Sequence, residues 1–196
     1  YVAMFKAEQK CEFAQAAAHA GRMFDIQTGM TKLSPFMGWH AYRSQEAEWE
    51  KKRMLTADAM LHGPTGELIA LLPEKASFRT DPFDDGRFER WQDLPTEAPV
   101  WRPISTTAGW DSQGLQDEHG HPYKGVAWYQ FDVPVPAGAK GKNAFLHGMA
   151  VVNEAWVWVN GKYVGHKPYK MPWSRPQALD MDVSKLLVAG RANRIT

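Results

Sequence analysis

The chain has 196 residues, 23 Lys and Arg, 22 Asp and Glu, and a formal net charge of +1. This balance leaves no excess of basic side chains to neutralise phosphates, which argues against a nucleic-acid partner. No apolar run is long enough to span a membrane, so a membrane partner is not expected either. A single cysteine, Cys11, excludes an internal disulfide framework and a multi-cysteine metal site.

The first 62 residues predict helices. Residues 4–23 are rich in Ala, Gln, Lys and Glu, with apolar side chains near a helical spacing. A loop is expected around Thr28-Gly29 and over 34–38. Ser44 is a candidate N-cap for a second helix, which His62-Gly63-Pro64 would end. Residues 1–65 are therefore interpreted as a helical segment, and the end of a preceding domain is one interpretation of it.

From residue 66 onward the pattern changes to short strands. Prolines and glycines recur every several residues, with aromatic and β-branched residues between them. This spacing predicts a β-sandwich over 66–196. The candidate strands are 68–72, 76–80, 126–135, 143–149, 155–159, 163–165, 177–181 and 194–196.

The strongest local signal is a hairpin centred on Asn160-Gly161, since Asn-Gly is the preferred pair for a two-residue type I′ turn. The expected pairs are Val159 with Lys162, Trp158 with Tyr163, and Val157 with Val164. Both faces of this hairpin are apolar, so we expect it inside a sandwich or under a covering loop.

Five ordered motifs give a family resemblance. They are Trp101-Arg102-Pro103-Ile104 with Trp110, Gly125-Val126-Ala127-Trp128-Tyr129-Gln130-Phe131, the strand with Lys142, Leu146 and Gly148, the hairpin 155–165, and the closing segment 182–195. Together they resemble the sugar-binding jelly-roll domain that precedes the catalytic barrel in family 2 glycoside hydrolases, the β-galactosidase and β-glucuronidase family. The resemblance covers roughly residues 74–196.

The resemblance implies a mainly β fold, a jelly-roll or galactose-binding-like β-sandwich, here preceded by two α-helices. The family's sandwich continues for another strand or two beyond the last motif, and the chain starts at Tyr1 without a signal-peptide pattern. We therefore expect a fragment, truncated at the C-terminus of its sandwich. The resemblance also favours a secreted or periplasmic location.

No catalytic residue is predicted in this chain. The family's two catalytic glutamates lie on a (β/α)₈ barrel, which needs about 200 residues or more. Asn153-Glu154 is similar to the family's acid/base pair, but it directly precedes the hairpin, so Glu154 is interpreted as a strand-end or surface residue.

No cofactor is expected, although two clusters allow a metal hypothesis. His119 and His121 with neighbouring carboxylates, and Asp81, Asp84 and Asp85 as a structural calcium site, are the candidates. A solvated polar loop and a plain acidic turn are the favoured alternatives.

A sugar site would combine an aromatic platform with a few polar side chains. The connection after the hairpin supplies His166, Tyr169, Trp173 and Arg175, and the long loop after Trp101 supplies Trp110 and Asp111. Contact with another domain is an equal alternative for Tyr169 and Trp173.

These observations predict a non-catalytic module of a modular glycoside hydrolase acting on β-glycosides. It would bind carbohydrate or support the substrate cleft, and its partners would be carbohydrate and other domains of the same polypeptide. A purely structural packing domain with no ligand is the alternative.

Overall fold

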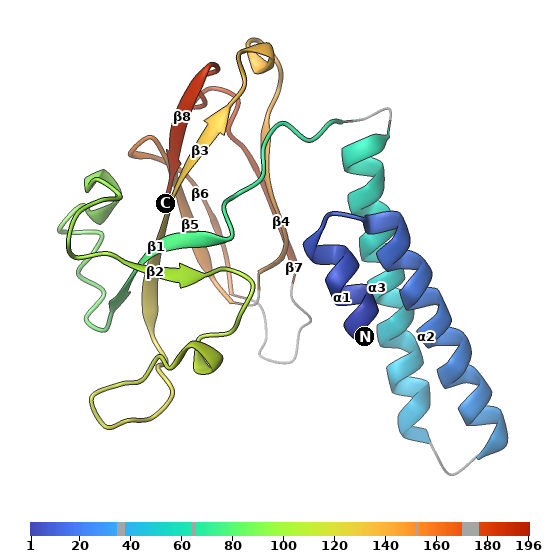
Figure 1. The fold of residues 1–196 in the computed structure, drawn as a ribbon. Coiled ribbons are helices and arrows are strands. Elements are labelled where there is room, and N and C mark those ends of the chain that lie inside the picture. The colour runs from blue at the N-terminus through green and yellow to red at the C-terminus, as the bar shows by residue number, and fades with distance from the viewer. Residues whose placement is uncertain (35–37, 64–65, 152, 170–176) are drawn as a thin grey trace. The chain divides into compact units, whose positions relative to one another are not determined.

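The computed structural model describes residues 1–196 except 35–37, 64–65, 152 and 170–176. The chain divides into two compact units, Tyr1–Leu68 and Ile69–Thr196. The first unit is helical and the second is built from β-strands (Figure 1). None of the helices in the described ranges is both long and apolar enough to cross a bilayer.

The helical unit contains α1 (Val2–Gln9), α2 (Phe13–Leu33) and α3 (Gly38–His62), and α2 and α3 lie side by side (Figure 1). Its core is made largely of alanines and methionines: Met4, Ala7, Phe13, Ala16, Ala17, Ala20, Ala47, Met54 and Ala57. Small side chains at a helix contact let the two backbones approach closely. An ion pair between Arg53 and Glu8, with an N–O distance of 2.6 Å, joins α3 to α1.

The helical unit has three described helices, whereas the sequence predicts two, because the chain turns at Cys11. Cys11 has a φ of 58°, in the left-handed region that usually ends a helix at glycine. The Cys11 N–H donates to the carbonyl of Glu8, and the Glu12 N–H donates to the carbonyl of Ala7. These bonds satisfy the last carbonyls of α1, so α1 ends there and α2 starts afresh.

The helix boundaries also differ from the prediction. α2 continues through Thr28-Gly29 to Leu33, and α3 starts at Gly38, so Ser44 lies within α3 and is not its N-cap. The Thr31 hydroxyl donates to the Gln27 carbonyl within α2. Packing between long neighbouring helices outweighs the weak local loop signal of single Thr, Gly and Ser residues.

The second unit contains eight strands within its described residues, and the predicted β-sandwich is confirmed. One sheet has the order β2-β1-β3-β8-β5-β6 and the other pairs β4 with β7, all antiparallel. The strands are β1 (Lys75–Asp81), β2 (Arg102–Ser105), β3 (Val126–Val135), β4 (Phe145–Val151), β5 (Ala155–Val159), β6 (Lys162–Lys167), β7 (Gln177–Asp182) and β8 (Arg191–Ile195).

Two strand predictions differ from the structure. The sequence pattern does not indicate β2, and residues 68–72 form no strand. Ile69 and Ala70 instead pack against the hydrophobic core between the two sheets. These two side chains are therefore apolar because they contact the core, although their segment pairs with no neighbouring strand.

The inner face of the six-stranded sheet meets β4 and β7 through aliphatic side chains. The buried residues of this core are Val133, Ala144, Val157, Val159, Leu179, Val183 and Ile195. A second apolar cluster continues it under β1 and β2, with Ala76, Phe78, Ile104, Leu115 and Tyr123. Alternation along β3 places Tyr129, Phe131 and Val133 on this inner face, as the sequence predicts.

The outer face of the same sheet is covered by the segment 82–101, which includes the short 3₁₀ helix η1 (Trp91–Asp93). The Gln130 side chain on β3 donates to the carbonyls of Trp91 and Leu94 and is 1% exposed. Trp128, also on β3, is buried beside Trp91, with ring centroids 5.9 Å apart. This segment is the kind of covering loop that the apolar hairpin predicts.

The hairpin has the predicted turn and most of the predicted register. Asn160 and Gly161 have φ values of 52° and 77°, and Val159 pairs with Lys162 and Trp158 with Tyr163. The pairing of Val157 with Val164 is wrong, because an irregularity shifts the register and Val157 pairs with Gly165. Such a bulge inserts one residue into β6 and changes which side chains follow along that strand.

Candidate functional site

Of the predicted sugar-contact residues on the connection after the hairpin, the structure describes His166 and Tyr169, on or directly after the edge strand β6 of the six-stranded sheet. His166 is on the edge strand β6, and its ring stacks on Trp156 with centroids 4.8 Å apart. His166 Nε2 lies 2.6 Å from Glu154 Oε1, so Glu154 makes a surface pair with an imidazole. Tyr169 follows β6 and is 49% exposed. Trp173 and Arg175 lie outside the described residues.

The other predicted set lies near the opposite edge. The Trp110 indole donates to the Tyr129 hydroxyl, and its ring contacts Phe78 with centroids 6.0 Å apart. Trp110 therefore packs against the second apolar cluster, while Asp111 is exposed and begins the 3₁₀ helix η2 (Asp111–Gln113). Burial raises the pKa of the Tyr129 phenol, and the hydrogen bond from the Trp110 indole partly opposes this shift.

The described members of the two predicted sets, His166 and Tyr169 on one side and Trp110 and Asp111 on the other, lie on different parts of the sheet. Trp110 packs over β1 and β3, whereas His166 belongs to β6, and β8 and β5 lie between these strands in the sheet. His166 and Trp110 therefore belong to separate surfaces of the sandwich.

A row of aromatic rings crosses the outer face of the sheet. Trp101, Trp91, Trp128, Trp158 and Tyr163 follow one another with centroid distances between 5.2 and 6.4 Å. The guanidinium of Arg79 lies 3.5 Å from the centre of the Trp91 ring, a cation–π contact that holds η1 against β1. The inner members of this row are structural, and Tyr163 at its end is 54% exposed.

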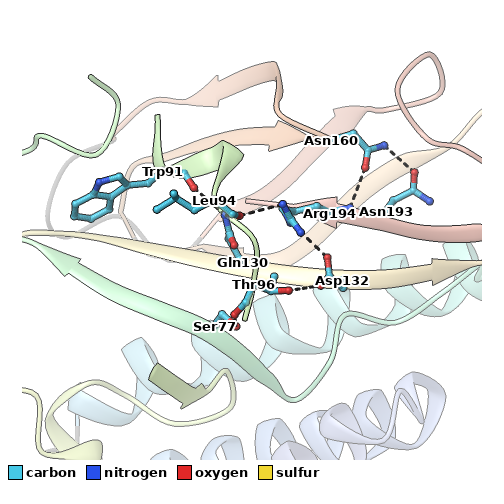
Figure 2. A network of polar contacts seen from close by, with 9 residues as sticks. All are labelled: Ser77, Trp91, Leu94, Thr96, Gln130, Asp132, Asn160, Asn193 and Arg194. Atoms are coloured by element: carbon cyan, nitrogen blue, oxygen red, sulfur yellow. Dashed lines mark hydrogen bonds and ion pairs between the residues drawn. The ribbon is translucent and has the colours of Figure 1, made fainter. Parts of the chain in front are cut away.

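One end of this outer face holds a polar pocket of about 340 Å³. Its lining comes from four segments: Gln92 and Asp93 of η1, Asp132 of β3, Asn160 and Gly161 of the hairpin turn, and Ala192 and Arg194 of β8. Figure 2 shows the network behind it, in which Arg194 lies between the carbonyl of Leu94 and the carboxylate of Asp132. Asp132 also accepts a hydrogen bond from the Thr96 hydroxyl.

Two asparagines fix the hairpin turn beside this pocket (Figure 2). The Asn160 amide donates to the Leu186 carbonyl and to Asn193 Oδ1, and Asn160 Oδ1 accepts from the Arg194 N–H. Asn193 is fully buried and bonds both the N–H and the carbonyl of Val188. Both asparagine side chains therefore have structural hydrogen-bond partners. Asn160, held by these bonds, forms a rigid wall of the pocket.

The residues of the metal hypotheses have other partners. Asp81 Oδ1 accepts from the Asp85 N–H, and Asp81 Oδ2 accepts from the Gly86 N–H and the Trp128 indole. Asp117 accepts the backbone N–H groups of both His119 and His121. Across the parts of the chain that the structure describes, no group of three or more His, Cys, Asp or Glu side chains is arranged to hold an ion. A metal site stays a sequence-based prediction.

Sequence reasoning misses the polar pocket. Asp132 and Arg194 are ordinary polar positions in alternating strands, and their pairing across β3 and β8 depends on the sheet register. Gln92 and Asp93 lie in a segment without a strand or helix signal. The one available signal is Asn160-Gly161, which marks the turn but not what faces it.

No family model matches the chain. A β-glucuronidase of Paenibacillus borealis is 29% identical over 120 residues, which is 61% of this chain and 19% of that relative. The helical unit, Tyr1–Leu68, is too short to carry a match of this length, so the β-sandwich takes part in it.

Solved structures of the β-glucuronidase from Ruminococcus gnavus share the fold. The complex with D-glucuronic acid and the complex with an N1-substituted uronic isofagomine match with TM-scores of 0.53 and 0.54 at 18% identity. Each match covers 64% of this chain and 20% of that one. The chain thus spans about a fifth of the length of the β-glucuronidases it matches, and the resemblance inferred from the sequence motifs is confirmed.

Proposed function

We propose that this chain supplies a non-catalytic β-sandwich module of a glycoside hydrolase that acts on β-glycosides, as β-glucuronidases do. The observation that carries the proposal is the double likeness to β-glucuronidases, in sequence over 120 residues and in fold. Because a fold alone does not fix a function, the sequence likeness is the part that points to glycoside chemistry.

The contribution of the module is carbohydrate contact or support of the substrate cleft at the β6 edge. The half-exposed Tyr169 offers a flat apolar ring, and sugars present C–H faces that stack on such rings. Three residues before Tyr169 in the chain, His166 pairs with Glu154, and both side chains carry groups that hydrogen-bond to hydroxyls. A platform with neighbouring polar groups is the usual composition of a sugar-contact surface.

The structural partners of three carboxylates of the sandwich support a role without chemistry. A retaining glycosidase needs two carboxyl groups about 5–5.5 Å apart, one of them an acid and one a nucleophile. Here Asp81 holds a buried turn, Asp132 is engaged by Thr96 and Arg194, and Glu154 pairs with His166. Each is bound to a structural partner and none faces another carboxylate in these contacts.

The second candidate is a packing domain that binds no ligand. Phe83 and Phe88, in the segment that covers the outer face, are 83% and 85% exposed. Large exposed apolar side chains close together in sequence favour contact with another protein surface. The packing role is the alternative to carbohydrate contact for this β-sandwich.

The test combines a glycan-array screen of the whole chain with assays on p-nitrophenyl β-D-glucuronide and β-D-galactoside. Binding without turnover supports the carbohydrate-contact role, and it should weaken in Tyr169→Ala and Trp173→Ala but not in Tyr1→Ala, an equally exposed tyrosine of the helical unit. Neither binding nor turnover supports the packing domain. Turnover of either substrate would overturn the proposal that the chain is non-catalytic.

A further inference from the structure

We propose that the C-terminal half of α2 is a self-association surface, through which two copies of this chain pair with their α2 helices antiparallel. The helical unit leaves a stripe of apolar side chains exposed on this half of the helix. Self-association goes beyond the proposed function and does not rest on it, because that function concerns the β-sandwich.

The apolar stripe consists of Ile26, Met30 and Leu33, which are 62%, 39% and 87% exposed. Steps of four and three residues place these side chains on the same side of a helix. α3 lies beside α2 (Figure 1), yet the buried residues of α2 all lie in its N-terminal half: Phe13, Ala16, Ala17 and Ala20. Neighbouring apolar side chains that stay exposed on one side of a helix are typical of an interaction surface.

Gly29 lies within this stripe, between Ile26 and Leu33. A glycine inside a helix costs about 1 kcal/mol relative to alanine. A Cβ on Gly29 would meet nothing within 4 Å beyond its chain neighbours and the backbone of its own helix. No close contact with the described residues therefore requires a glycine here. A second helix, by contrast, can approach the backbone closely at a position without a side chain.

Two exposed charges flank the stripe, Asp25 and Lys32. They are seven residues apart, which is nearly two helical turns, so both lie on the same flank. Neither takes part in an ion pair or hydrogen bond among the residues that the structure describes. Both charges are therefore available to a partner that packs on the stripe.

These charges are complementary to a second copy of the same helix. In an antiparallel pair with two-fold symmetry, residue i of one copy meets residue j of the other, and j meets i. A pair centred next to Gly29 brings Asp25 of each copy to Lys32 of the other, so the contact forms twice. The same centre sets Ile26 against Met30 of the second copy. A parallel pair in register would instead place like charges at the same level.

The expected dimer is weak. Residues 22–33 form only about three helical turns, which offer much less area than a standard stable interface. A dissociation constant of about 100 µM is therefore expected. Sedimentation equilibrium of the whole chain between about 10 µM and about 1 mM measures this association, and the average mass should rise from that of a monomer towards that of a dimer. Added salt should weaken the dimer, because its ion pairs are exposed.

A substitution in the stripe tests the surface. Ile26→Glu places a charge in the proposed contact and should weaken the dimer by at least about tenfold. Leu55→Glu is the matched control, since Leu55 is a 48% exposed leucine of α3 that lies outside the stripe, and it should associate as the unmodified chain does. Both replaced side chains are exposed, so circular dichroism should show the same helix content in both variants.

Charge reversal tests the antiparallel order. Asp25→Lys alone and Lys32→Asp alone set like charges against each other, and each variant should associate about tenfold more weakly than the unmodified chain. An equal mixture of the two variants should associate as the unmodified chain does, because one copy then offers two cations and the other two carboxylates. Recovery in the mixture also shows that both variants are folded.

Three results would overturn the self-association surface. They are a monomer at every concentration, equal association of Ile26→Glu and the unmodified chain, and no recovery in the mixture of the two charge variants. A monomer at every concentration would assign the stripe to a different protein surface. None of these results tests the non-catalytic role, which is decided by the turnover assays.

Discussion

The two faces of the six-stranded sheet are stabilised in different ways. The inner face buries valine, isoleucine and phenylalanine against β4, β7 and the loop that carries Trp110. The outer face buries tryptophans together with Asp81 and Gln130, whose polar atoms bond to the covering segment 82–101. Apolar burial is non-directional, whereas hydrogen bonds fix the position of their partners.

This difference indicates which face stabilises the fold and which face shapes a site. The inner face supplies free energy in proportion to the area that it removes from water. The outer face fixes where η1 lies, and η1 supplies Gln92 and Asp93 to the polar pocket. Substitutions on the two faces should therefore separate loss of stability from loss of pocket geometry.

The largest effect should come from the inner face. Phe78 is fully buried, with its ring edge-on to Tyr129 at 5.1 Å, so Phe78→Ala should lower the free energy of unfolding by about 3–5 kcal/mol. Urea denaturation followed by tryptophan fluorescence measures this loss. Phe88→Ala, at an exposed ring, is the control, and an equal loss in both variants would contradict the assignment of the core.

A smaller loss with a local signature is expected on the outer face. Asp81 is 2% exposed and its carboxylate accepts three hydrogen bonds, so Asp81→Ala should cost about 3 kcal/mol. Hydrogen exchange should accelerate first at the amides of Asp85 and Gly86. Asp111→Ala, at an exposed residue that begins η2, serves as the comparison, and uniform acceleration over both faces in Asp81→Ala would contradict a local role.

Gly161→Val tests the junction between the hairpin and η1. Valine resists a φ of 77°, and its Cβ would meet Asp93 Oδ1, so a loss of about 2 kcal/mol is expected. The melting temperature of Gly161→Val should therefore fall clearly below that of Gly109→Val. Gly109 has open space around it and no positive φ. Equal melting temperatures would argue against a strained turn.

The smallest effect concerns an exposed carboxylate outside both faces. The Ser184 hydroxyl and backbone N–H donate to Asp182 Oδ1 and hold the pKa of that carboxyl below its ordinary value. Because the folded-state pKa is lowered, the associated stability is present above the unfolded-state pKa and is lost as the pH falls through the folded one. Ser184→Ala should raise the pKa in an NMR titration, and more than Lys185→Ala does, since the charge of Lys185 is the weakest influence.

Much of the sandwich was predictable because its signals are local. Asn160-Gly161 specifies a turn with two positive φ values, and alternation along β3 assigns its faces correctly. The helix break was not predictable in this way, since Cys11 takes a left-handed conformation without being glycine. The register shift opposite Val157 also has no local signal, because pairing across strands decides it.

The candidate sites were predictable to the same extent, because sequence patterns do not reveal contacts between distant segments. The aromatic residues at 166 to 175 are conspicuous in sequence, and the structure describes His166 and Tyr169 at the sheet edge. Trp110 is equally conspicuous, yet its ring packs on Phe78. The polar pocket depends on four segments between 92 and 194, so only the assembled sheet reveals it.

The place of β8 in the sheet has a consequence for the order of folding. β8 lies between β3 and β5, yet it follows both of them in the chain. During synthesis, the facing edges of β3 and β5 therefore stay unpaired until residues 191–195 leave the ribosome. Unpaired edges are templates for pairing with other chains, and distant strand pairing is slow. The nascent sandwich is thus most exposed to aggregation just before its central strand is inserted.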